Sequence, residues 1–243
     1  MLLKLVNVSK HYELGDTIIK ALDKINLSIQ KGEFVAIMGP SGSGKSTFLQ
    51  VASMLAQPSE GQIYLKDKEV TTYNEIERAK LRNQEIGFIF QQFNLLPRTS
   101  ALDNVALPLV YAGVTGQERK RRSQEMLTKV GLGDRLSNTP AQLSGGQQQR
   151  VAIARALIND PAVIFADEPT GNLDSKSGED IIELLKKLHH EGKTIIMVTH
   201  ELETAQSAHR LVVFKDGQVQ KDTAVKGEAD IERHLNKQVK KKK

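Results

Sequence analysis

Two glycine-rich segments carry the residues best suited to chemistry. The first reads Gly39-Pro40-Ser41-Gly42-Ser43-Gly44-Lys45-Ser46 and follows the apolar run Phe34–Met38. Its glycines let successive backbone N–H groups close around phosphate oxygens without side-chain clash. Lys45 would neutralise β- and γ-phosphate charge, and the Ser46 hydroxyl would ligate Mg²⁺. The helix expected next, which includes Thr47, points its positive end at the same anion. The spacing predicts that the chain binds a nucleoside triphosphate.

The second glycine-rich segment is Leu143-Ser144-Gly145-Gly146-Gln147, which lies just ahead of a helical stretch. It has the glycines of a phosphate-binding turn, but it lacks the lysine and the preceding buried strand of a full site. We therefore interpret it as a phosphate-binding tip that serves a site elsewhere.

Two acids follow an apolar run in Val163-Ile164-Phe165-Ala166-Asp167-Glu168. A strand here would bring Asp167 beside the first glycine-rich loop, where its carboxylate can hold the magnesium shell. Glu168, at the tip of the strand, is suited to orient and polarise an attacking water molecule. The alternative is that two exposed acids merely end a strand. The phosphate loop in the same chain favours the catalytic interpretation.

The elements that must position these residues follow from hydrophobic periodicity. Alternation at Leu3, Leu5 and Val8, and again at Ile25, Leu27 and Ile29, predicts antiparallel strands with one buried face. Continuous apolar runs at 34–38 and 86–90 predict strands buried on both faces. A helix is expected from the phosphate loop to about Leu55, and a short strand at 63–65.

Helical spacing dominates from about Phe93 to Gln149, with helices expected at 101–111 and 117–130. Strand and helix then alternate again, with strands at 162–166 and 194–198 and a helix at 175–190. Asp216-Gly217 is a strong hairpin turn signal between the apolar run 211–214 and the segment Gln218-Val219-Gln220. The order predicts an α/β core with a helical insertion.

Taken in order, seven motifs resemble those of the ATPase subunits of ABC transporters, over about residues 1–220. They are Tyr12, the loop 39–46, Gln91, the segment 143–147, Asp167-Glu168, Asn172-Leu173-Asp174 and His200. The resemblance implies a P-loop NTPase (RecA-like) α/β fold with an antiparallel β subdomain and an inserted α-helical subdomain. It implies a single domain over 1–225, with its core at 1–91 and 150–225 and the insertion at 92–149. A C-terminal helix and lysine-rich tail would follow over 226–243.

The same resemblance implies a role for each single residue. Tyr12 would stack on adenine, although a lone tyrosine is more often a packing residue. Gln91 would reach Mg²⁺ and the attacking water, and His200 would contact the γ-phosphate. Asp174 would communicate across a dimer, in which the tip at 144–147 binds the γ-phosphate held by the opposite subunit. The implied cofactors are ATP and Mg²⁺, and the implied enzyme is an ATPase.

A narrower resemblance rests on the stretches 87–97 and 101–109. They are similar to the branch that contains macrolide-efflux (MacB-type) and lipoprotein-release (LolD-type) ATPases. This branch implies a transmembrane permease as partner, with a periplasmic-type adaptor as a further component. Leu95, Leu96 and Pro97 would form the docking surface for a short helix of that permease. Phe93 could instead pack the insertion onto the core.

Composition bears on the cellular compartment in which the protein is expected. The chain has no cysteine, which suits a reducing cytoplasm. Its polar Asn7 comes too early for a signal-peptide core, and no apolar run approaches the length of a membrane span. Together with the permease partner that the resemblance implies, these features lead us to expect a peripheral protein at the cytoplasmic face of a membrane. Of the formal charge of +5, four positive charges lie in Lys240–Lys243. This tail could be a solvated end or a contact to anionic lipid, and the run 119–122 is interpreted as a solvated helix face.

Three functions remain open at this stage. The leading one is a motor subunit that drives a separate permease for export or lipoprotein release. A mechanical regulator that transmits ATP-driven motion to cell-envelope enzymes would show the same motifs. A soluble ATPase acting on nucleic acid is disfavoured, because the chain has one cassette and no long heptad stretch.

Overall fold

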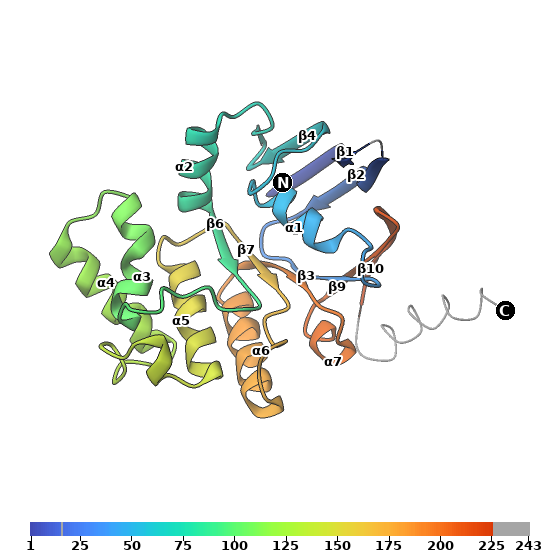
Figure 1. Ribbon diagram of the computed structural model, residues 1–243. Coiled ribbons are helices and arrows are strands. Elements are labelled where there is room, and N and C mark those ends of the chain that lie inside the picture. The colour runs from blue at the N-terminus through green and yellow to red at the C-terminus, as the bar shows by residue number, and fades with distance from the viewer. Residues whose placement is uncertain (16, 226–243) are drawn as a thin grey trace. The chain divides into compact units, whose positions relative to one another are not determined.

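Strands and helices gather into two compact units, formed by Met1–Tyr73 with the chain from Thr194 onward, and by Asn74–Lys193. The computed structural model describes residues 1–15 and 17–225 (Figure 1). The helical insertion expected at 92–149 lies within the second unit. The C-terminal helix and tail expected at 226–243 lie outside the described residues.

The first unit contains an antiparallel sheet of strand order β2-β1-β4-β5. Leu3 pairs with Ile29, Leu5 with Leu27, and Val8 with Ile25. This register places all six predicted apolar side chains in the core, so the predicted strand pair is confirmed. The strands are β1 (Leu3–Leu14), β2 (Thr17–Ile29), β4 (Glu60–Leu65) and β5 (Lys68–Glu69).

The same unit contains strands in the order β10-β9-β3-β8. They are β3 (Phe34–Met38), β8 (Thr194–Val198), β9 (Arg210–Lys215) and β10 (Gln218–Ala224). β8 and β9 run parallel to β3, while β10 is antiparallel to β9. Every residue of β3 and of β8 is buried, as a strand covered on both faces requires. The hairpin turn has positive φ at Asp216 (49°) and Gly217 (75°), which confirms the turn signal.

The described residues of the first unit also form helices α1 (Lys45–Ala52) and α7 (Leu202–Ala205). α1 begins at Lys45, within the last residues of the phosphate loop 39–46, and buries Phe48, Leu49 and Val51. It ends earlier than the predicted Leu55. Ser53 leaves the helix as its C-cap, and Met54 then takes a left-handed φ of 62°.

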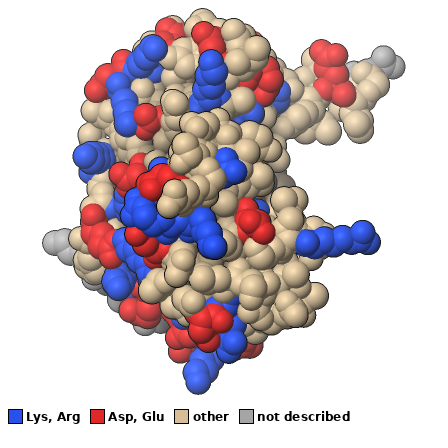
Figure 2. All heavy atoms as spheres, turned by 90° about the vertical axis from the view of Figure 1, so that its left-hand side faces the viewer, with Lys and Arg blue, Asp and Glu red and all other residues tan. Residues whose placement is uncertain are grey.

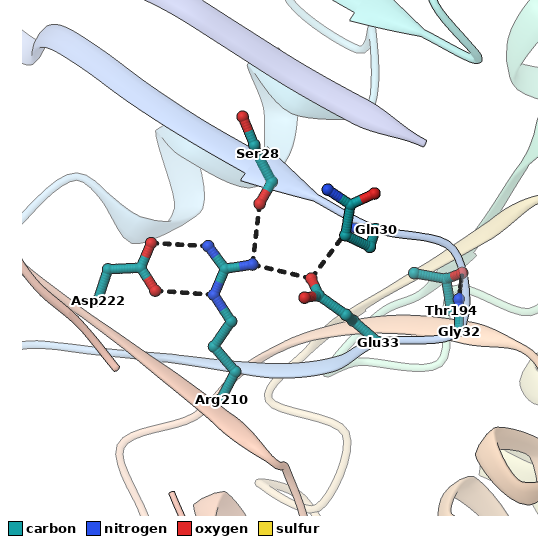
Figure 3. A network of polar contacts seen from close by, with 7 residues as sticks. All are labelled: Ser28, Gln30, Gly32, Glu33, Thr194, Arg210 and Asp222. Atoms are coloured by element: carbon teal, nitrogen blue, oxygen red, sulfur yellow. Dashed lines mark hydrogen bonds and ion pairs between the residues drawn. The ribbon is translucent and has the colours of Figure 1, made fainter. Parts of the chain in front are cut away.

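Arg210 joins four segments of the first unit (Figure 3). Its Nε and Nη2 atoms each donate to Asp222 of β10 at 2.7 Å. Its Nη1 donates to the Ser28 carbonyl and to Glu33 Oε2, both at 2.8 Å. This bidentate pair with two further acceptors ties the start of β9 to β10, to the end of β2 and to the turn before β3.

The second unit is built around the parallel pair β6 (Ile86–Ile89) and β7 (Val163–Asp167), in which Phe88 lies opposite Phe165. Figure 1 shows α3, α4 and α5 packed side by side. The long α6 buries Ile181, Ile182, Leu185 and Leu188 on one face. The helices are α2 (Glu75–Glu85), α3 (Ala101–Tyr111), α4 (Gly116–Lys129), α5 (Gly145–Leu157) and α6 (Ser175–His190), with a 3-10 turn at Pro140–Gln142.

The helices predicted at 101–111 and 175–190 and the strand at 194–198 have the predicted bounds. Helix α2 was not predicted, because every one of its residues is at least partly exposed and it has no apolar stripe. A sequence signal was nevertheless present. Asn74 and Glu77 form a capping box, with Asn74 Oδ1 accepting from the Glu77 N–H at 3.0 Å.

The basic run 119–122 on α4 is largely engaged within the second unit. Arg121 pairs with Glu118 at 2.6 Å and with Glu125 at 2.7 Å. Arg122 donates to the Ile158 carbonyl at 2.7 Å. Figure 2 shows basic and acidic side chains interspersed on the face it presents. The run is therefore a paired surface rather than a single-sign patch.

Among the residues that the structure describes, no helix is both long enough and apolar enough to cross a membrane.

Candidate functional site

The phosphate loop of the first unit has a backbone that only glycine can adopt at key positions. Gly39 has φ 155°, and a Cβ there would lie 2.3 Å from the Phe214 carbonyl oxygen. Gly44 has φ 98°, and a Cβ there would lie 2.4 Å from the Ala21 carbonyl oxygen. Both contacts are with backbone and cannot move aside. The loop is thus held tightly against β9 and β2, directly at the start of α1.

Two polar side chains of this loop, those of Ser43 and Lys45, are buried, whereas Ser41 and Ser46 are exposed. Lys45 Nζ donates to the Gly39 carbonyl at 2.8 Å and to the Pro40 carbonyl at 2.9 Å, and the residue is 9% exposed. Ser43 Oγ is buried and has no hydrogen-bond partner within the described part of the chain. A buried hydroxyl without a partner is costly, and an anion oxygen would satisfy it. The loop therefore has hydrogen-bond donors of the kind that bind phosphate.

The other predicted residues of the first unit are Tyr12 and His200. Tyr12 is 40% exposed on β1, with Lys10 Nζ lying 5.3 Å from the centroid of its ring. An exposed aromatic ring of this kind can stack on a base. His200 is exposed and follows the fully buried strand β8.

The two acids lie at the end of β7 in the second unit. Asp167 is the last residue of the strand and is half-buried. Glu168 has a left-handed φ of 44°, and its carbonyl accepts a hydrogen bond from the Gly171 N–H at 3.0 Å. A left-handed non-glycine residue is strained, and such residues cluster at functional sites. The turn 168–171 thus holds the Glu168 side chain in an unusual direction.

Gln91 lies against this same turn. A Cβ added to Gly171 would be 2.8 Å from Gln91 Nε2, so the Gln91 amide packs directly against Gly171 and would have to shift for a larger residue. The Asn172 side chain donates to the Gln91 carbonyl at 2.9 Å. The structure therefore brings Gln91, Glu168 and the segment 171–172 together.

The glycine-rich tip 144–147 forms the start of α5. Ser144 caps the helix, accepting from the Gln147 N–H at 3.3 Å, while Gln147 Oε1 accepts from the Ser144 N–H at 3.0 Å. The Gln147 side chain thus makes local capping bonds. Gly145 and Gly146 lie beside Leu173 and Ser177. A Cβ added to Gly145 would be 3.3 Å from the Leu173 side chain, and one added to Gly146 would be 3.1 Å from that of Ser177.

Asp174 is the N-cap of α6. Its carboxylate accepts from the Ser177 hydroxyl at 2.7 Å and from the Ser177 N–H at 2.9 Å. Both bonds hold the pKa of the Asp174 carboxyl below its ordinary value, and the bond from the Ser177 hydroxyl has the larger effect. Asp174 therefore stays ionised and positions the start of α6.

Sequence reasoning missed two residues of α5. Gln149 is fully buried, and its Nε2 donates to the Pro169 carbonyl at 2.7 Å. Arg155 donates to the Asn94 carbonyl at 2.6 Å and to the Phe93 carbonyl at 2.8 Å, and burial lowers the pKa of its guanidinium. Polar residues on the buried face of an otherwise apolar helix are the signal that could have found them.

A family model described as "ABC transporter" matches residues 22–171. The chain belongs to the ABC transporter family and is an ATP-hydrolysing subunit of that class. Its fold is that of the ABC ATPase cassettes, a P-loop NTPase fold with an antiparallel β subdomain.

Individual relatives indicate the branch of the family to which the chain is most similar. An uncharacterised ABC transporter ATP-binding protein of Thermotoga maritima is 53% identical over 90% of this chain and 93% of its own length. A macrolide export ATP-binding/permease protein, MacB, of Chlorobaculum tepidum is 52% identical over 91% of this chain, which spans 34% of that longer protein. These relatives confirm the resemblance to the MacB branch.

Solved structures agree with the sequence relatives. One shows the ATP-binding cassette MJ0796, from Methanocaldococcus jannaschii, as a dimer in a post-hydrolysis state bound to ADP and Pi. It matches 93% of this chain and 100% of its own with 49% identity and a TM-score of 0.85.

Proposed function

We propose that the chain is the motor of an export complex, working as a homodimer that closes head to tail around two Mg-ATP and drives a separate permease. The observation that carries the nucleotide part is the phosphate loop, where Gly39 and Gly44 exclude any side chain and the buried Ser43 hydroxyl awaits an acceptor. The hydroxyl of Ser46 and the carboxylate of Asp167 are hard oxygen ligands of the kind that Mg²⁺ prefers.

Ser46 and Asp167 would hold Mg²⁺, which would supply positive charge against the negative charge that develops on the phosphates. The protein's own residues do the rest. Lys45 exchanges its two loop carbonyls for phosphate oxygens, and the loop N–H groups cradle the phosphates. Tyr12 supplies the platform for the base. Glu168 accepts a proton from the attacking water, while Gln91 and His200 orient the water and the γ-phosphate.

The head-to-tail dimer accounts for the second glycine-rich tip. Ser144, Gly145 and Gly146 lie at the start of α5, where backbone N–H groups and the helix dipole favour an anion. In the dimer these residues would meet the γ-phosphate held by the opposite subunit, with Asp174 near the contact. The structures of MJ0796, which are described as dimeric, support this assembly.

The permease partner is supported by the macrolide export relatives, whose names describe an ATP-binding/permease protein. In this chain the docking surface would be Leu95, Leu96 and Pro97. Leu96 is 44% exposed, yet its N–H is held by the buried Asn104 side chain at 2.8 Å. An exposed apolar side chain on a loop that is held in place is a feature of binding surfaces. Docking of this kind would bring the chain to the cytoplasmic face of the membrane.

The nucleotide part is tested by binding and hydrolysis of Mg-ATP by the purified chain. Lys45→Ala should lose hydrolysis and weaken ATP binding at least about tenfold, since it removes a charge that contacts phosphate. Lys20→Ala, at an exposed position on β2, is the matched control and should behave as the parent. Equal ATP affinity in the Lys45 and Lys20 variants would refute the site.

The docking part is tested with Leu95→Asp/Leu96→Asp. We expect basal ATP hydrolysis of the isolated subunit to stay near the parent value, while co-purification with a co-expressed permease partner is lost. Ile76→Asp is the control, because Ile76 is 69% exposed on α2 of the same unit. A double variant that unfolds, or that still binds the permease, would make these leucines core residues or place the docking surface elsewhere.

A further inference from the structure

The turn that follows Gln91 has a strained backbone. Phe93 and Asn94 are consecutive non-glycine residues with left-handed φ values of 58° and 50°. The Asn94 N–H donates to the Gln92 carbonyl at 2.5 Å, which tightens the chain further. Left-handed conformations are disfavoured for residues with a Cβ. Two in succession persist only where the surroundings hold them.

Arg155 is the residue that holds them. Its Nη1 donates to the Asn94 carbonyl at 2.6 Å and its Nη2 to the Phe93 carbonyl at 2.8 Å. The planar fork of a guanidinium presents two donors in fixed geometry, so it specifies the directions of both carbonyls at once. The half-buried setting of Arg155 strengthens these charged hydrogen bonds.

The backbone of Gln91 is held on its other side as well. The Asn172 side chain donates to the Gln91 carbonyl at 2.9 Å. Gln91 therefore lies between an amide donor from the segment after Glu168 and a turn clamped by Arg155. Arg155 belongs to the same helix, α5, that begins after Ser144.

We propose that Arg155 is a positioning residue for ATP hydrolysis, which clamps the left-handed turn 92–94 and thereby sets the position of Gln91. This inference rests on the proposed role of Gln91 at the nucleotide. It also makes Arg155 the link through which a shift of the tip at 144–146 reaches Gln91, because one rigid helix carries both ends.

The test uses the purified full-length chain with Mg-ATP and two substitutions. Arg155→Met keeps the side-chain stem and removes both donors, and Arg155→Lys keeps the charge but cannot span both carbonyls. The matched control is Arg122→Met, because Arg122 also donates to a backbone carbonyl in the same unit, that of Ile158 at 2.7 Å.

Two readouts are needed. In steady-state kinetics we expect Arg155→Met to lower kcat about tenfold or more, with KM within about twofold, because Gln91 is displaced while the phosphate loop is intact. In hydrogen exchange we expect the amides of 92–97 to exchange about tenfold faster, with the rest of the unit unchanged. Arg155→Lys should fall between the parent and Arg155→Met, and Arg122→Met should match the parent in both readouts.

Parent values of kcat and of exchange at 92–97 in both Arg155 variants would overturn the proposal. So would exchange that rises throughout the second unit in Arg155→Lys, since that pattern belongs to a general packing role. Failure of the proposed function looks different. There the parent chain itself would not hydrolyse Mg-ATP, or Gln91→Glu would hydrolyse it at the parent rate.

Discussion

The residues that carry the proposed chemistry are held in conformations that side chains ordinarily avoid. Glu168 has a φ of 44°, and Gly39 and Gly44 occupy positions where a Cβ would collide with backbone. These conformations are maintained by neighbouring carbonyls and N–H groups rather than by local preference. A substitution that keeps the shape of such a side chain therefore tests its chemistry without releasing the strain.

Glu168→Gln is the sharpest substitution of this kind. The amide keeps the shape and loses the carboxylate that accepts a proton from water, so turnover should fall roughly a hundredfold or more. ATP binding should remain, and the ATP-bound dimer should accumulate because it cannot be consumed. Size-exclusion chromatography with Mg-ATP checks the dimer, and phosphate release checks turnover. A monomeric variant that hydrolyses at the parent rate would refute the role of Glu168.

The Asp174 cap gives a prediction in pH. The carboxyl pKa of Asp174 is lowered in the folded chain from an ordinary value of 3.8. A lowered pKa contributes stability that is complete above 3.8 and disappears as the pH falls through the folded value. The urea midpoint of the parent should therefore exceed that of Asp174→Ala at pH 6, and the difference should shrink below pH 3.8. A difference that is constant across this range would show that the charge of the cap contributes nothing.

At the scale of the elements, a helix or strand could be predicted from the sequence where residues close together in the chain determine it. Strand pairing of β1 with β2 followed from alternating side chains, and the bounds of α3 and α6 followed from helical spacing. The glycine spacing of the phosphate loop predicted its conformation for the same reason. Helix α2 was not predicted because it is stabilised by its cap and by surface ion pairs rather than by an apolar stripe.

The buried polar residues could not be read from sequence in this way. Arg155, Gln149 and Asn104 each bond backbone carbonyls or N–H groups outside their own helix, at Asn94, Pro169 and Leu96. Their roles depend on which loops the fold brings to α5 and α3. A polar residue in an apolar helix signals such a contact, but the partner becomes known only in three dimensions.

Arg210 provides the stability prediction at this scale. Arg210→Met removes four hydrogen bonds to Asp222, Ser28 and Glu33 and leaves two carboxylates without their partner. Loss of hydrogen bonds to charged groups should lower the free energy of unfolding by about 2–4 kcal/mol. Urea denaturation measures it. Arg121→Met is the control, since its pairs with Glu118 and Glu125 are exposed and such pairs add little. Equal midpoints for the two variants would contradict the importance of the network.

At the scale of the whole molecule, each of the two units carries only one of the two phosphate-binding elements. The first unit has a phosphate loop with Lys45 but no second glycine-rich tip. The second unit has the tip at 144–146, whose glycines lie beside Leu173 and Ser177, and the tip has no lysine of its own. Two copies arranged head to tail would give each loop a tip from the opposite copy. The proposed dimer is therefore the assembly in which every phosphate-binding element is used.

This arrangement predicts complementation between two inactive chains. Lys45→Ala removes the phosphate contact of the loop, and Ser144→Arg places a bulky side chain at the tip. Each homodimer carries its defect at both sites, whereas a mixed dimer has one site in which a parent loop faces a parent tip. Mixing should restore hydrolysis or at least trapping of nucleotide, at most to about half of the parent level if the sites act independently. Differently tagged chains verify that mixed dimers form. If verified mixed dimers trap no nucleotide at any ratio, each loop must use the tip of its own chain, and the head-to-tail dimer is wrong.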